Sequence, residues 1–160
     1  MVSLFVIALT AAACKSVHQA GVSQDAIPQE IINGNSKVLF TEINFENTVS
    51  KNTAKVHNNS ARKYLNQKMN NKAIFISEGD LNNALYSDKN IYRFVLMNRI
   101  TAEVNKKYVT ENTRRQVAEA DTYITEFYFL DRLTGKEYPH VKGTTMPLYM
   151  FKAIVDKVSS

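Results

Sequence analysis

The chain has 160 residues, with 20 Lys and Arg against 15 Asp and Glu and a net charge of +5, a size that suits a single core. The cations are mixed with acids, and no Arg/Gly or aromatic-interleaved motif accompanies them, so a solvated surface is favoured over a nucleic-acid interface. A basic face could also meet an acidic wall polymer or an anionic membrane surface. The single cysteine excludes an internal disulfide.

The first segment of the chain is apolar and short. Residues 2–13 suit the apolar region of a signal peptide and are too few to span a bilayer. Small residues, Ala11-Ala12-Ala13, stand directly before Cys14, and this junction resembles the lipobox of bacterial lipoproteins. The resemblance implies a signal peptide over 1–13 and a lipidated Cys14. Two alternatives stay open: ordinary signal-peptidase cleavage after Ala13, and a buried N-terminal helix.

A polar segment follows the cysteine. Residues 15–35 hold two Gly, one Pro and several Gln and Ser with no sustained hydrophobic period. We therefore predict a flexible linker after the cysteine, over 14–35, and a globular domain over 36–160. Lys15 favours the outer membrane, since the inner-membrane retention signal of enterobacterial lipoproteins is Asp at that place.

The first half of the domain alternates strands and helices. Residues 36–45 predict a strand covered on both faces, and 73–77 predict a short buried strand. Between them, 54–69 form an amphipathic helix with Ala61, Leu65 and Met69 on one face. This order favours a right-handed parallel crossover. Residues 79–88 predict a short helix capped by Asp80, with Leu81, Ala84 and Leu85 facing inward.

The strongest periodic signal is an alternation of period two over residues 91–104, which predicts a long strand. Its even positions, from Tyr92 to Val104, form the buried face. The other face offers a possible partner contact, because Met and Arg are enriched at interfaces, and a terminal helix covering it is the alternative. A second run, 122–131, should pair with the first as an extended hairpin with its tip at 112–115. The possible contact residues are Arg93, Val95, Met97 and Arg99.

A tight turn, a last strand and a helix close the chain. Gly135 can take the positive φ that the turn needs, while Asp131 and Thr134 can bond its backbone. Residues 136–142 predict a strand, and a helix follows with Thr145 as its N-cap and Pro147 in its first turn. The sequence thus predicts an α+β fold with a single mixed sheet, in the order β-α-β-α-β-β-β plus a C-terminal helix, with helices packed on the sheet.

Two stretches, "VLFTEINFENT" and "FYFLDRLTGKEY", carry a resemblance to a known family. They resemble the penicillin-binding-protein activator LpoB family, whose folded part is similar to the N-terminal domain of TolB and to part of CsgG. The matching motifs are Asn47-Thr48 and the turn from Asp131 to Gly135, and the resemblance covers roughly residues 36–144. It implies a protein partner in the cell envelope, such as a penicillin-binding protein.

The sequence offers little material for catalysis. His18, His57 and His140 lie far apart, and the chain has no metal-ligand spacing, nucleophile elbow or glycine-rich phosphate loop. Three carboxylates at hairpin ends are expected to be solvated: Asp121, Glu126 and Asp131. We predict no enzyme, with no catalytic residue, no metal site and no cofactor.

Two functional hypotheses remain. The first is an outer-membrane-anchored periplasmic lipoprotein that binds and regulates a partner, by resemblance a peptidoglycan synthase activator or an envelope-assembly factor. The second is a surface-exposed lipoprotein with a structural or host-interaction role. In both, the lipid anchor is the contact with the membrane, and nucleic acid is not a partner. Capture of a periplasmic partner would support the periplasmic hypothesis. Loss of the domain when whole cells are treated with protease would support the surface-exposed hypothesis.

Overall fold

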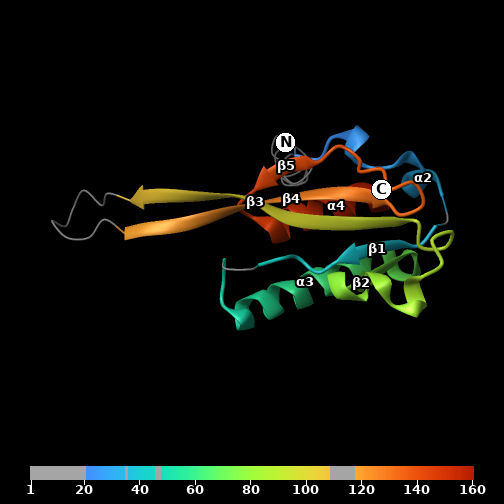
Figure 1. Ribbon diagram of the computed structural model, residues 1–160, viewed down its shortest axis with the longest axis horizontal. Coiled ribbons are helices and arrows are strands. Elements are labelled where there is room, and N and C mark those ends of the chain that lie inside the picture. The colour runs from blue at the N-terminus through green and yellow to red at the C-terminus, as the bar shows by residue number, and fades with distance from the viewer. Residues whose placement is uncertain (1–20, 35, 46–47, 109–117) are drawn as a thin grey trace, which may run out of the picture.

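The computed structural model describes residues 21–34, 36–45, 48–108 and 118–160, without the side chains of 102–108, 118–122 and 142 (Figure 1). Cys14 and the predicted hairpin tip at 112–115 lie outside the described residues. The regular elements are α2 (Gln29–Asn33), β1 (Val38–Thr41), α3 (Lys51–Met69), β2 (Ala73–Ile76), β3 (Phe94–Tyr108), β4 (Ala118–Asp131), β5 (Val141–Thr144) and α4 (Pro147–Ser159), with short 3-10 turns η1 (Gln24–Ala26), η2 (Asn70–Lys72), η3 (Glu78–Asn82) and η4 (Ala84–Tyr86).

The strands form one mixed five-stranded sheet in the order β2-β1-β3-β4-β5, which confirms the predicted fold class. β1 runs parallel to both of its neighbours, β2 and β3, while β3, β4 and β5 are successively antiparallel. All four residues of β1 are buried, because the central part of the sheet is covered on both faces. The far ends of β3 and β4 extend past the other three strands (Figure 1).

The main core lies between the sheet and the helices α3 and α4. Phe151 of α4 packs edge-on against Phe40 of β1, with ring centroids 5.7 Å apart, and against Phe75 of β2 at 5.8 Å. Ala61, Leu65 and Met69 of α3 are buried beside it, as the amphipathic pattern predicts. Leu65, Phe94 and Leu96 are buried as predicted, with exposures of 1% or less, and Phe127 of β4 is buried to the same extent.

The predicted linker needs correction. Val22, Ala26, Ile27 and Ile31 are all buried in the main core, with Ile27 only 2% exposed. They follow one another at spacings of four, one and four residues, so η1 and α2 turn them toward the same side. The apolar surface that they bury attaches residues 22–31 to the body, and the folded unit begins before residue 36.

The opposite face of the sheet carries a smaller core. Val95 and Met97 of β3 are buried there with Leu39 and Ile76. The predicted short helix over 79–88 is instead the two 3-10 turns η3 and η4, which pack Leu81 and Tyr86 onto this cluster. Leu85 is 72% exposed and Ala84 is also exposed, because the turns break the helical phase that would direct them inward.

A bulge shifts the alternation of β3. Ile100 pairs with Thr125 and Ala102 with Ile124, so Thr101 is an extra residue between them. Before the bulge, even residues of β3 pair with odd residues of β4, and after it even pairs with even. The predicted single face from Tyr92 to Val104 therefore ends at Ile100.

The end of the chain differs from its prediction in two details. β5 begins only at Val141, although Glu137 already forms an isolated bridge to Leu130. Pro139 lacks the N–H that a continuous ladder needs, which explains the late start. The N-cap of α4 is Met146 and not Thr145, and the Met146 N–H donates to Thr144 Oγ1 at 3.0 Å.

Candidate functional site

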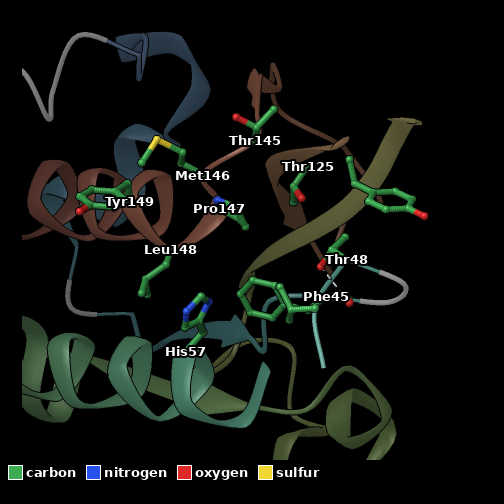
Figure 2. Close-up of a pocket in the computed structure, with 11 residues that line it drawn as sticks. Phe45, Thr48, His57, Thr125, Thr145, Met146, Pro147, Leu148 and Tyr149 are labelled. Carbon is green, nitrogen blue, oxygen red and sulfur yellow. Dashed lines mark hydrogen bonds between the residues drawn. The ribbon is translucent and has the colours of Figure 1, made fainter. Parts of the chain in front are cut away.

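A hollow of about 540 Å³ opens where the β1–α3 connection, β4 and the start of α4 meet (Figure 2). Three segments that are far apart in the sequence supply its walls, and the side chains converge on one space. The residues that line the hollow are Phe45, Thr48, Val49, His57, Tyr123, Thr125, Thr145, Met146, Pro147, Leu148 and Tyr149.

A buried amide fixes the chain where it leaves β1. The Asn98 Nδ2 group donates to Thr41 Oγ1 at 3.1 Å and to the Glu42 carbonyl at 2.8 Å, and its Oδ1 accepts from the Asn44 N–H at 2.7 Å. Asn98 is 7% exposed. Because both ends of this buried amide are bonded, it holds residues 41–44 in one conformation.

A second amide joins the same segment to α3. Asn58 accepts from the Ile43 N–H at 2.9 Å and donates to the Ile43 carbonyl at 3.1 Å. The next turn is closed at Phe45, whose carbonyl accepts from the Thr48 N–H at 3.0 Å and the Thr48 hydroxyl at 2.9 Å. Phe45, 8% exposed, is thus a fixed part of the floor of the hollow.

His57 contributes an imidazole that lies between the floor and α4. Its ring meets the Phe45 ring at 5.2 Å in an edge arrangement (Figure 2). The Nδ1 atom is buried and has no hydrogen-bond partner among the described residues. In the neutral ring an N–H without an acceptor costs free energy, so the proton is better placed on Nε2. His57 is half-buried in this position.

The rim of the hollow is apolar and accessible. Met146 is 55% exposed, Tyr149 53% and Val49 38%, although each is a large side chain of the kind that usually packs inside or at an interface. None of the described residues that line the hollow is a carboxylate or a Lys or Arg. The lining therefore suits binding of an uncharged group better than acid–base chemistry, which needs a paired titratable group.

The structure divides the predicted contact face on β3. Val95 and Met97 are buried, at 0% and 8% exposure, so they cannot meet a partner. They are covered by the 3-10 turns and not by a terminal helix. Arg93 is committed to an ion pair with Asp131, and only Arg99 is exposed. The prediction of a four-residue partner contact is thus corrected, because two of its members belong to the smaller core.

The predicted turn residues, Asp131, Thr134 and Gly135, form a turn at the end of β4. Gly135 has φ of +73°, its N–H donates to the Asp131 carbonyl at 2.8 Å, and Thr134 Oγ1 accepts from the Lys136 N–H at 3.3 Å. Asp131 Oδ1 accepts from the Leu133 N–H at 2.9 Å, and its Oδ2 accepts from the Arg93 Nη2 group at 2.7 Å.

Asp131 is 1% exposed, which corrects the expectation of a solvated carboxylate. The Arg93 guanidinium, together with the Leu133 N–H and the Thr134 hydroxyl, lowers the pKa of Asp131 to about 2, against the opposing effect of burial. Of the other two carboxylates, the side chain of Asp121 lies outside the described set. Glu126 meets His140 Nδ1 at 3.1 Å.

His140 stands in a bonded cluster on the outer sheet face. Its Nε2 meets Glu137 at 3.2 Å, and its ring stacks on Tyr128 with centroids 4.7 Å apart. Arg99 lies over the same Tyr128 ring at 5.3 Å. Both ring nitrogens of His140 have a partner, and Arg99 also meets Glu126 at 3.8 Å, so the cluster is a bonded surface network.

Sequence reasoning did not find the hollow. Met146 and Tyr149 lie outside the apolar side of α4. The one local signal for a binding site was the presence of a Met and a Tyr beside Pro147, because both residue types are enriched at interfaces. Phe45 was assigned to a strand face. Its position in the hollow depends on contacts from Asn58 and Asn98, which no local pattern indicates.

Two absences concern the described residues. Within them, no group of three or more His, Cys, Asp or Glu side chains could hold a metal ion. No helix of the described ranges is long and apolar enough to cross a bilayer.

Comparisons with known proteins give weak structural neighbours. No protein-family model matches the chain, and no curated protein matches it. The similar solved structures include the PelC dodecamer from Paraburkholderia phytofirmans, at 12% identity over 79% of this chain and 89% of that chain. They also include a single-substitution variant of it, at 11% identity over 78% of this chain and 88% of that chain. Both have a TM-score of 0.41. Likenesses of this size leave the family of the chain open.

Proposed function

We propose that this chain is a non-catalytic binding protein of the cell envelope, which receives an uncharged, largely apolar group of a protein partner in the hollow beside α4. The observation that carries the proposal is the neutral apolar lining under an exposed rim of Val49, Met146 and Tyr149. Exposed apolar side chains that surround a hollow mark interaction sites more often than isolated ones do.

The floor and the rim contribute differently to such binding. Phe45 and Thr125 are held in place before a partner arrives, at 8% and 2% exposure, so forming the complex does not have to order them. Met146 and Tyr149 can adapt to the partner, since Met is flexible and Tyr combines an apolar ring with a polar tip. Burial of one aromatic or aliphatic anchor in the hollow would contribute roughly 1.5–3 kcal/mol.

The proposed location is the periplasmic side of the outer membrane, with lipidated Cys14 as the anchor. Because Val22 already belongs to the core, seven residues, 15–21, separate it from Cys14, and the span from Cys14 to Val22 can reach about 29 Å at most. This short tether supports a protein that works next to its own membrane. By its resemblance to the LpoB family, the partner would be a peptidoglycan synthase or an envelope-assembly factor.

The test is capture of envelope proteins by the full chain, with two matched double variants. Met146→Ser with Tyr149→Ser removes apolar surface from the rim. Leu85→Ser with Ile91→Ser removes comparable exposed apolar residues, at 72% and 49% exposure, away from the hollow. We expect the rim variant to lose a partner that the wild type and the second variant retain, with unchanged melting temperatures. Equal capture by both variants would disprove a role for the hollow.

A further inference from the structure

Helix α3 carries the whole excess charge of the protein. Five of the 20 cations lie within Lys51–Met69 and none of the acids does, so the rest of the chain has 15 charges of each sign. The five cations stand together in the sequence, because residues 47–77 contain no acid. They all belong to one helix, which lies along the β2 side of the sheet (Figure 1). The cations are Lys51, Lys55, Arg62, Lys63 and Lys68.

Only two of these cations have an acidic partner in the described part of the chain. Arg62 meets Glu42 at 3.4 Å and Lys68 meets Asp156 at 3.1 Å. Lys51, Lys55 and Lys63 are exposed and form no ion pair with any described residue. Lys51 and Lys63 are twelve residues apart, about 18 Å along the helix axis.

This arrangement opposes the stability of α3. Lys51 stands in the first turn, where the helix dipole disfavours a cation, and that turn contains no acid. Lys51 and Lys55 are four residues apart, a spacing at which like charges repel. A helix that keeps several unfavourable charges on its solvent side is consistent with a binding surface.

We propose that the solvent side of α3 is a docking surface for an acidic polysaccharide, a flexible polymer rich in hydroxyl groups and carboxylates. The lysines would pair with its carboxylates. Carboxamides stand between them and can donate and accept hydrogen bonds with hydroxyl groups. These exposed carboxamides are Asn52, Asn59, Asn66 and Gln67.

The same surface fits the other polyanions less well. An anionic membrane is bound by a helix that also inserts apolar side chains, and Val56 is the one large apolar residue among the exposed positions of α3. Single-stranded nucleic acid is held by aromatic stacking, and the exposed side of α3 has no aromatic residue.

The experiment measures binding of the full chain to polygalacturonate by titration calorimetry at low salt. The test variant replaces three lysines by Gln, at Lys51, Lys55 and Lys63. A matched control replaces Lys37, Lys89 and Lys136 by Gln. These three lysines are also exposed, so both variants have the same net charge. Neutral dextran, anionic phospholipid vesicles and single- and double-stranded DNA are measured in parallel.

We expect the wild type to bind polygalacturonate, to release it as salt rises, and to ignore dextran. The α3 variant should bind about tenfold more weakly, as three exposed ion pairs would give, while the control keeps wild-type affinity. The α3 variant should also melt no lower than wild type, because it loses repulsion. No wild-type binding, equal losses in both variants, or tighter binding to vesicles or DNA than to polygalacturonate would each overturn the proposal. None of these outcomes depends on the hollow, so the two proposals fail separately.

Discussion

The pair formed by Asp131 and Arg93 gives the sharpest prediction about stability. Asp131 is 1% exposed, and its pKa is lowered from the ordinary 3.8 to about 2, first by the Arg93 guanidinium and then by the Leu133 N–H and the Thr134 hydroxyl. That lowering corresponds to at most about 2.4 kcal/mol of stability. Solvent screens part of it, because Arg93 is 30% exposed. We therefore expect Asp131→Asn to cost about 1–2 kcal/mol at pH 7.

The pH dependence separates this charge effect from a simple packing loss. Because the folded-state pKa lies below the unfolded one, the carboxylate stabilises the protein above about pH 4, and this contribution is lost as the pH falls toward 2. The difference between wild type and Asp131→Asn should shrink over that window. Asn retains an oxygen that can accept from the Leu133 N–H, so the substitution mainly removes the charge.

The assay is urea unfolding followed by far-UV circular dichroism between pH 7 and pH 2.5, since the chain has no Trp. Glu42→Gln is the control, because its pair with Arg62 is exposed on both sides, and it should cost at most about 0.5 kcal/mol at every pH. A cost for Asp131→Asn that stayed constant from pH 7 to pH 2.5 would refute the role of the charge pair.

Three further predictions concern the turn, the outer face and the anchor. Gly135→Val should cost about 1–3 kcal/mol in thermal melts because of the φ of +73° alone, since an added Cβ meets nothing within 4 Å. Gly135→Asn should cost clearly less. Equal melting temperatures for the wild type and both variants would contradict backbone strain at this turn. Arg132→Ala removes donors to three backbone carbonyls between Leu81 and Tyr92, so amide hydrogen exchange in that segment should become faster while exchange in β1 stays unchanged. An equal increase of the exchange rate in both segments would contradict a local role for Arg132. Cys14→Ser should abolish palmitate labelling and membrane partitioning, and unchanged partitioning would exclude the anchor.

Strong periodic patterns made most of the fold predictable. The spacing of Ala61, Leu65 and Met69 gave α3, and alternation gave β3 and β4, because each pattern spans several turns or strand residues. The predicted linker failed for the opposite reason. Its apolar residues, from Val22 to Ile31, lie in or beside two very short helical pieces on either side of Pro28, and no hydrophobic period runs through them. Only the contacts with the core make these pieces stable.

The bulge in β3 had no local signal at all. Thr101 is an ordinary strand residue, and nothing in the alternation from Phe94 to Ile100 indicates that an extra residue follows. The position of a bulge depends on contacts with the partner strand and with the neighbouring layer. Here the pairing of β3 with β4 shifts next to Thr125, which also pairs with β5. Patterns of period two predict that a strand exists, but not where its faces exchange.

The hollow and the basic surface of α3 illustrate two different limits of the sequence. The hollow arises from three segments, each of which looks ordinary by itself: a turn after β1, a buried stretch of β4 and the first turn of α4. Its existence depends on long-range hydrogen bonds of Asn98 and Asn58, which position Phe45. The basic surface, in contrast, is visible once the bounds of α3 are known, because the charge of one helix can be counted from its letters. The net charge of +5 for the whole chain does not indicate this surface. The same total results whether the excess cations lie on one helix or are scattered evenly along the chain.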